Sequence, residues 1–195
     1  MAEIWMITHG QVTRDPAVPV PQWPLTPEGR TRHGRLNARL VAEGFGSLWS
    51  SPEQKARDAA EIHGTALGLV PGVREGLSEN DRSSTGFLPP HQFEAAADAF
   101  FGAPDVSWNG WETAAAAQAR ILRTVRAIDA EAVPGNVLIC GHGAVTALTL
   151  CHAMGVPISR QWDQPGGGGG NVIRLRRGDL GLLAGWTSIE DLAVA

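Results

Sequence analysis

Residues 3–10 read Glu-Ile-Trp-Met-Ile-Thr-His-Gly, an apolar run that stops at a histidine and a glycine. Such a run is typical of a strand that is buried on both faces and opens into a loop. Residues 136–143, Asn-Val-Leu-Ile-Cys-Gly-His-Gly, repeat the pattern. Ligands of a parallel α/β sheet gather at the carboxyl ends of its strands, so we expect His9 and His142 to face one pocket. Taken singly, each histidine also suits a loop or a hydrogen-bonded core position.

The segments around these two strands alternate between helical and extended patterns. Thr26, Pro27 and Glu28 indicate a helix start with a threonine N-cap, and Gly44 and Gly46 are expected to end that helix. The other expected elements are strands at 47–50, near 73 and at 136–140, helices at 52–62, 91–100, 114–132 and 143–155, and a hairpin of 172–176 with 180–186. This order predicts an α/β fold with a largely parallel sheet covered on both faces. The sequence shows no repeat and no linker, and we therefore expect a single domain over residues 1–195.

The composition limits the function classes. The 195 residues are 43% hydrophobic and 18% charged, which suits a globular protein and argues against a disordered chain or a coiled coil. The formal net charge is −4 and the isoelectric point is about 5.8, so the bulk charge provides no attraction to nucleic acid or anionic lipid. An anionic ligand must therefore be held by a local cluster. Lys55 is the only lysine among 16 basic residues.

Neither the amino-terminal segment nor the cysteine content indicates export. The apolar stretch 4–7 is short and follows no basic segment, and Cys140 and Cys151 are too few for a disulfide framework. The stretch 132–159 carries no formal charge, but its Gly-His-Gly and Asn136 favour a buried strand, turn and helix over a membrane span. We expect a cytoplasmic protein with no nucleic-acid or membrane partner.

Five short motifs follow one another along the chain. They are Thr8-His9-Gly10, Leu25-Thr26-Pro27-Glu28-Gly29, Ser50-Ser51-Pro52 followed by Lys55-Ala56, Leu77-Ser78-Glu79, and Gly141-His142-Gly143. Together they resemble the histidine phosphatase superfamily, in which the first motif is Arg-His-Gly and the third is Ser-Ser-Pro followed by Arg-Ala. The resemblance covers nearly the whole chain. It implies the phosphoglycerate mutase-like fold, with a mixed, mostly parallel six-stranded sheet between two helical layers, and a phosphatase that needs neither a metal nor a cofactor.

The resemblance also implies roles for individual residues. His9 is the expected nucleophile, which attacks a phosphate monoester in line and forms a phosphohistidine that water then hydrolyses. This chemistry requires a neutral imidazole, fixed donors and cations for the equatorial oxygens, and an acid for the leaving alkoxide. Glu79 matches that acid, and His142 matches a second imidazole that contacts the phosphate. The N–H groups that follow it at a helix start, beginning with Gly143, are further expected donors.

Two positions depart from the family pattern. Thr8 replaces the arginine before the nucleophile and carries no charge, and Lys55 replaces the second arginine without its planar fork. Arg14 and Arg82, in the loops that flank the proposed site, are candidates for the missing charge, but each also suits a solvated surface position. Lys55 itself also suits an exposed position on its helix.

Two function classes therefore stay open. The first is a phosphatase that acts on a small phosphorylated substrate, with mutase activity less favoured. The second is a phospho-ligand-binding or regulatory protein that keeps the fold and both histidines but has lost efficient catalysis. A metal-dependent hydrolase is disfavoured because the sequence has no cluster with metal-ligand spacing, and an acyl hydrolase because no Gly-x-Ser-x-Gly motif occurs.

The glycine run 166–170 lacks the lysine of a phosphate-binding loop and precedes an expected strand. We interpret it as a flexible rim loop through which Asn171 contacts the site. The substrate and the oligomeric state stay open at this stage, because the loops 13–23 and 83–111, which would decide specificity, have no derivable conformation.

Overall fold

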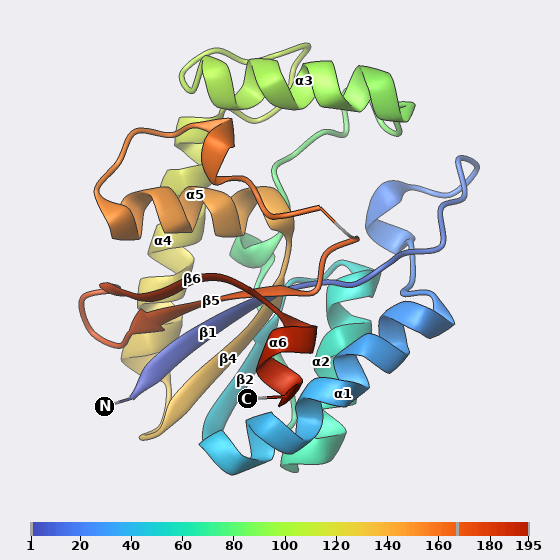
Figure 1. The fold of residues 1–195 in the computed structure, drawn as a ribbon. Coiled ribbons are helices and arrows are strands. Elements are labelled where there is room, and N and C mark those ends of the chain that lie inside the picture. The colour runs from blue at the N-terminus through green and yellow to red at the C-terminus, as the bar shows by residue number, and fades with distance from the viewer. Residues whose placement is uncertain (1, 167, 195) are drawn as a thin grey trace.

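The computed structural model describes residues 2–166 and 168–194, so Met1, Ala195 and Gly167 of the glycine run lie outside the described residues. Strands and helices alternate along most of the chain (Figure 1). The strands are β1 (Glu3–Thr8), β2 (Phe45–Ser50), β3 (Gly72–Val73), β4 (Asn136–Gly141), β5 (Asn171–Arg176) and β6 (Leu182–Ser188). The helices are α1 (Pro27–Glu43), α2 (Gln54–Leu67), α3 (Pro90–Gly102), α4 (Ala114–Glu131), α5 (Gly143–Met154) and α6 (Ile189–Val194). Short 3-10 turns cover Val20–Gln22, Glu75–Leu77 and Arg160–Trp162.

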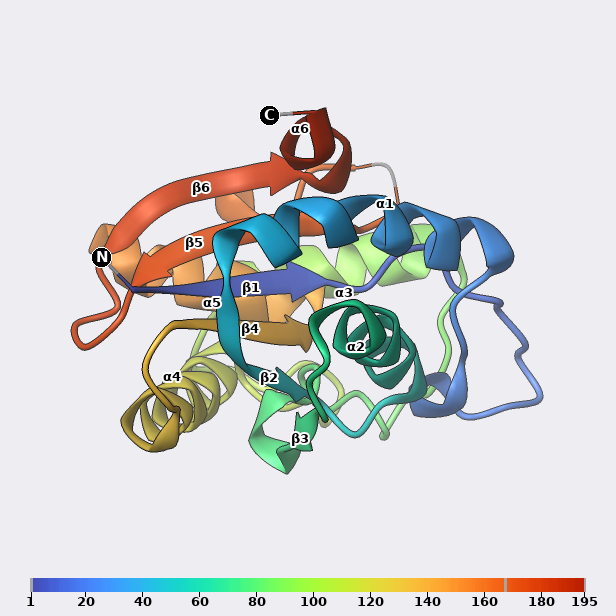
Figure 2. The same ribbon diagram turned by 90° about the horizontal axis from the view of Figure 1, so that it is seen from below.

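The six strands form one mixed sheet in the order β3-β2-β4-β1-β5-β6. Figure 2 shows the strands side by side in this order. The strands β1, β2, β3 and β4 run parallel, whereas β5 pairs antiparallel with both β1 and β6. Because the parallel strands end at the same edge, the segments that follow β1, β2 and β4 are brought together there.

Helices cover both faces of the sheet (Figures 1 and 2). On one face, Ile4 and Met6 of β1 pack with apolar residues of α4 and α5. On the other face, Trp5 and Ile7 pack with residues of α1, α2 and α6. A strand buried on both faces needs apolar side chains at successive positions, which explains the uninterrupted run in this part of the sequence. The expected three-layer, mostly parallel α/β fold is confirmed.

The helix α1 begins and ends where Thr26 and Gly44 predict. The Thr26 Oγ1 accepts a hydrogen bond from the Gly29 N–H at 3.0 Å, which is the N-cap contact that a threonine makes. Gly44 ends the helix with a positive φ of 72°, a conformation that glycine adopts without strain. Gly46, expected to end the helix as well, lies in β2, where the pairing with β4 shifts register between Phe45 and Ser47.

Several other boundaries differ from expectation, and one helix is additional. The second helix begins at Gln54 and not at Pro52, because the backbone is still extended at Glu53, whose N–H donates to the Ser51 side chain. β6 begins later than expected, since the turn after β5 is lengthened by Leu180, which has a positive φ of 59°. The carboxyl-terminal α6 was not anticipated, because its six residues are too few for a helical period to be recognised.

Across the described ranges, none of the helices has both the length and the apolar character that a membrane span requires.

Candidate active site

The ends of β1, β2 and β4 bring three sequence motifs to one place. The ladder between β1 and β4 continues past Thr8, where the His9 N–H donates to the Gly141 carbonyl at 3.0 Å. The ladder between β2 and β4 continues in the same way, from the Ser51 N–H to the Cys140 carbonyl at 3.2 Å. As a result the rings of His9 and His142 lie 5.5 Å apart, centroid to centroid, in an edge-to-face arrangement.

The partly exposed imidazole of His9 is held in one tautomer. Its Nδ1 lies 2.8 Å from the Gly10 carbonyl oxygen, and because a carbonyl only accepts, the proton is on Nδ1. Burial, with a further contribution from the charge of Lys55, lowers the pKa of His9 to about 4. The ring is therefore neutral near pH 7, and its Nε2 carries a free lone pair. This is the state that a nucleophilic histidine requires.

His142 is fully buried, and only one of its two ring nitrogens has a partner among the described residues. Its Nε2 lies 2.6 Å from the Ser51 Oγ and 3.4 Å from a Glu53 carboxylate oxygen. Its Nδ1 has no hydrogen-bond partner among the described residues. Burial lowers the pKa of His142 to about 4, although the nearby Glu53 and Glu79 oppose that change. A buried ring nitrogen without a partner is an unusual feature that a ligand oxygen would resolve.

The side chain of Lys55 is in the interior and not on the surface of α2. It is 4% exposed, and its Nζ lies 2.5 Å from a carboxylate oxygen of Glu53, which is itself 9% exposed. The Nζ also donates to the Val20 carbonyl at 3.1 Å. Burial alone would raise the pKa of Glu53, but His142 and Lys55 outweigh it and lower that pKa to about 2. The lysine charge is therefore compensated by a buried anion.

Glu79 lies at the amino-terminal end of α5. Its carboxylate accepts hydrogen bonds from the N–H groups of Ala144 at 3.1 Å and Val145 at 3.2 Å. A third bond comes from the Asn80 N–H, and the Glu79 N–H itself donates to Glu53 at 2.9 Å. The carboxylate thus occupies N–H groups of the kind that commonly bind anions at a helix start.

Thr8 was expected to bind the phosphate, but its side chain is buried and makes a hydrogen bond within the protein. It is 0% exposed, and its Oγ1 accepts a hydrogen bond from the Asn171 N–H at 3.0 Å. The adjoining glycine segment reaches His9 as well, since the Gly170 N–H donates to the His9 carbonyl at 3.0 Å. A Cβ at Gly169 would collide with that same carbonyl, and its φ of 74° is unfavourable for other residues. Gly169 and Gly170 are therefore in contact with the backbone of His9, so this end of the glycine run is not only a rim.

The two candidate arginines have different surroundings. Arg14 is exposed, and within residues 2–166 and 168–194 it makes no hydrogen bond or ion pair with the histidine cluster. The guanidinium of Arg82 lies over the rings of Phe93 and Trp111, 5.1 and 5.7 Å from their centroids. Its charge makes a small contribution to the lowered pKa of His9. Gly143 is the first residue of α5, and the Gln164 side chain covers it.

Three residues near the site were not identified by the sequence analysis. Glu53 had one available signal, its position between the Ser-Ser-Pro motif and the single lysine. The side chain of Asn80 is 4% exposed, and its Nδ2 has no partner in the described parts of the chain. Arg120 of α4 binds the backbone of the loop that carries Glu79. Neither of the last two has a signal beyond the polar character of its segment.

The described ranges contain no cluster of three or more histidine, cysteine or acidic side chains with the spacing of a metal site.

The sheet order, the two helical layers and the histidine pair at adjacent strand ends define a phosphoglycerate mutase-like α/β protein. The family model of the histidine phosphatase superfamily (branch 1) matches residues 4–182, and the chain belongs to this superfamily. Membership supports a phosphatase-type activity. No curated protein sequence matches the chain.

Several solved structures share the fold. A mycobacterial glucosyl-3-phosphoglycerate phosphatase in complex with inorganic phosphate has a TM-score of 0.79 at 20% identity, with 97% of this chain and 99% of that chain covered. The Bacillus stearothermophilus protein YhfR has a TM-score of 0.80 at 22% identity, covering 94% and 95%. A putative alpha-ribazole-5'-P phosphatase from Escherichia coli has a TM-score of 0.74 at 17% identity, covering 97% and 99%. At these identities the similarity concerns the fold.

Proposed function

We propose that the protein hydrolyses a phosphate monoester through a phosphohistidine on His9, with Glu79 as the general acid and without a metal or cofactor. The observation that carries this proposal is the state of His9. Its Nδ1 proton is bound to the Gly10 carbonyl, its pKa is lowered to about 4, and the centroid of its ring lies 5.5 Å from that of His142. A neutral, oriented imidazole at the end of a central strand is well suited to in-line attack on phosphorus.

The reaction has two steps. The Nε2 of His9 attacks phosphorus, the bond between phosphorus and the leaving oxygen breaks, and Glu79 gives a proton to that oxygen. Water then attacks the phosphohistidine, Glu79 takes a proton from the water, and the phosphorus–nitrogen bond breaks to release phosphate. The second step restores the lone pair on the Nε2 of His9. The Glu79 carboxyl group serves as the acid in the first step and as the base in the second.

The phosphoryl oxygens need donors and positive charge, and four features supply them in this proposal. Lys55 has three N–H donors, of which two bind Val20 and Glu53, so one is left for a phosphate oxygen. The free Nδ1 of His142 gives a second contact, and Arg82 brings a charge that Thr8 lacks. The first N–H groups of α5 complete the site once the phosphate displaces the Glu79 carboxylate, which is then placed near the leaving group.

A second candidate function has its own support. Thr8 is engaged with Asn171, and the charge of Lys55 is compensated by Glu53. Both features reduce the stabilisation that a transition state with spread negative charge receives. A protein of this kind could bind a phosphorylated ligand without turning it over efficiently, as a regulatory or sensing protein does.

Hydrolysis of an aryl phosphate in the presence of a chelator separates the two candidates. The phosphatase proposal expects turnover by the intact protein and a loss of at least a hundredfold in His9→Ala, while both bind inorganic phosphate in calorimetry. Phosphate binding without turnover would favour the second candidate. Because one structural neighbour is a glucosyl-3-phosphoglycerate phosphatase, small phosphorylated sugar acids are suitable further substrates to test. We propose a single cytoplasmic domain over residues 1–195 as the acting unit.

A further inference from the structure

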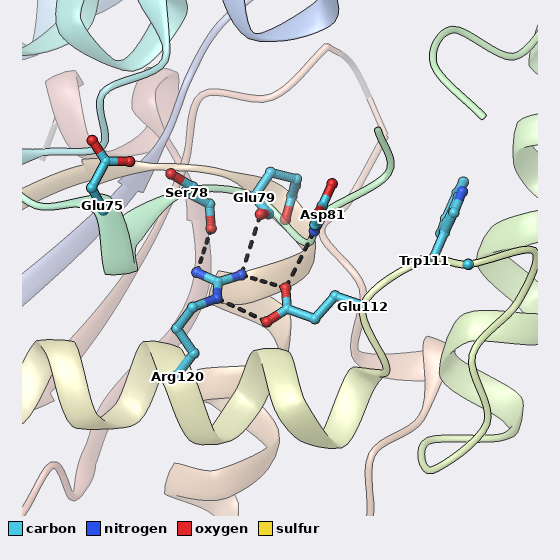
Figure 3. A pocket seen from close by; sticks show the side chains of 8 residues that line it. Glu75, Ser78, Glu79, Asp81, Trp111, Glu112 and Arg120 are labelled. Carbon is cyan, nitrogen blue, oxygen red and sulfur yellow. Dashed lines mark hydrogen bonds and ion pairs between the residues drawn. The ribbon is translucent and has the colours of Figure 1, made fainter. Parts of the chain in front are cut away.

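Arg120 connects α4 to the backbone of the loop that carries Glu79 (Figure 3). Its Nη1 donates to the carbonyl oxygens of Gly76 and Ser78, both at 2.9 Å, and its Nη2 donates to the Glu79 carbonyl at 3.2 Å. The remaining two N–H groups bind both carboxylate oxygens of Glu112, at 2.9 and 2.7 Å. A guanidinium has five N–H donors, and each has an acceptor here.

Glu112 extends the same connection to the far end of the loop. Its carboxylate accepts a hydrogen bond from the Asp81 N–H at 3.2 Å, and its own N–H donates to the Asp81 carbonyl at 2.9 Å. Residues 76–81 are therefore tied to α4, and to the segment before it, on both sides of Glu79. Figure 3 shows the guanidinium between the loop and the Glu112 carboxylate.

Apolar packing against α4 supports the start of this loop, whereas hydrogen bonds from Arg120 support the part around Glu79. A cavity of about 360 Å³ lies beside it, lined by Ser78, Glu79 and Asp81 of the loop, by the preceding Glu75, and by Glu112 and Arg120 opposite. Hydrogen bonds from Arg120 and Glu112 cross that space to the part of the loop around Glu79. The start of the loop packs closely against α4. Leu77 is buried in the core cluster that contains Ile121 and Val125, and a Cβ at Gly76 would collide with the Thr124 side chain.

We infer that Arg120, held by Glu112, is the positioning residue for the general acid. Arg120 fixes the backbone of Glu79, so the carboxylate lies at the start of α5 and stays within reach of the leaving group when a phosphate displaces it there. This inference rests on the proposed role of Glu79 as the acid. Arg120 does not touch the substrate in this account, and it acts only by setting where the Glu79 side chain can reach.

The planar fork is essential to this role. A lysine has three donors from a single atom and cannot span three carbonyl groups and a carboxylate at once. Arg120→Lys keeps the charge and most of the volume, so it separates loss of the fork from loss of charge. Glu112→Gln keeps the shape of the partner and weakens the bidentate contact.

The test uses a series of aryl phosphates whose phenols differ in acidity. A strongly acidic phenol leaves as a stable phenolate, so its departure depends little on protonation by a general acid. We expect kcat/KM of Arg120→Lys and Arg120→Met to fall by ten- to a hundredfold for the least acidic phenol and by less than threefold for the most acidic. Glu79→Gln should show the same pattern, more strongly. Arg123→Met, at an exposed position of the same helix, is the matched control and should retain the wild-type pattern.

The outcomes are distinguishable. An equal loss across the series in both Arg120 variants, with Glu79→Gln still selective for the poor leaving groups, would overturn the inference and leave the role of Glu79 intact. If Glu79→Gln itself shows no dependence on the leaving group, the proposed acid is wrong and the positioning role fails with it. Amide hydrogen exchange gives a second readout, in which Arg120→Lys should speed exchange at 76–81 while the strands keep their protection.

Discussion

The ammonium of Lys55 and a carboxylate oxygen of Glu53 lie 2.5 Å apart, both in the interior of the proposed pocket. Glu53 also accepts the N–H of Glu79 and lies 3.4 Å from the Nε2 of His142. One buried anion therefore contacts the lysine, the acid loop and the second histidine. In the absence of ligand, the Glu53 carboxylate therefore neutralises much of the positive charge of Lys55 that would otherwise attract a phosphate.

Replacement of Glu53 by glutamine should strengthen phosphate binding. The amide keeps the oxygen that accepts from the Glu79 N–H but removes the charge that competes for Lys55. A charge-assisted hydrogen bond contributes about 1.5–3 kcal/mol, so we expect the Kd for inorganic phosphate to fall by about tenfold. Titration calorimetry measures this, with Glu61→Gln, at an exposed position of α2, as the control. Weaker binding by Glu53→Gln would show that Glu53 helps to build the phosphate site.

Lys55→Met should cost both activity and stability. It removes a cation from the site and leaves Glu53 buried without its partner, for which we expect a loss of about 3–5 kcal/mol in the free energy of unfolding. The double variant with Glu53→Gln should recover most of the stability, measured by urea unfolding, but not kcat/KM. If the double variant regains both, the lysine has no part in the reaction.

Thr8→Val tests the contact that replaces the missing arginine. Valine has the shape of threonine but cannot accept from the buried Asn171 N–H, so we expect a loss of about 1–3 kcal/mol in stability. Thr8→Ser keeps the acceptor and should be much closer to the wild type. Equal stability of the valine and serine variants in urea would mean that this hydrogen bond does not hold the glycine segment.

The buried pair of His33 and His63 predicts sensitivity to acid. The Nδ1 of His33 lies 3.0 Å from the Nε2 of His63, whose Nδ1 is 2.8 Å from the Asn37 Oδ1. Burial lowers the pKa of His63 to about 3, and burial with its neighbour lowers that of His33. Both rings stay neutral in the folded state while the unfolded chain takes up protons below about pH 6.5. Stability is therefore complete above that pH and declines as the pH falls.

His63→Gln should reduce this decline. It removes one titrating ring and keeps a donor and an acceptor, so the slope of unfolding free energy between pH 6 and pH 4 should fall by up to about 1.4 kcal/mol per pH unit. Urea unfolding at several pH values measures the slope. His91→Gln, at an exposed position, is the control. An unchanged slope in His63→Gln would mean that the pair is already protonated in the folded protein.

The sequence predicted the elements whose signals are local. The apolar run of β1 and the Thr26 cap mark their elements within a few residues, and the histidines at two strand ends indicated where the parallel sheet would bring them together. The contacts of Thr8 and Arg120 could not be predicted in this way. Thr8 binds a residue 163 positions away, and Arg120 binds a loop more than 40 positions away, so no spacing rule connects the partners.

Detection of phosphohistidine on His9 tests the central claim most directly. The protein is mixed with excess aryl phosphate, quenched in base during turnover, digested and analysed by mass spectrometry, with His9→Gln and His63→Gln in parallel. The account predicts a phosphoryl group on the peptide that contains His9 in the wild type and in His63→Gln, and neither adduct nor turnover in His9→Gln. Turnover that persists in His9→Gln, or a phosphoryl group on another residue, would contradict it.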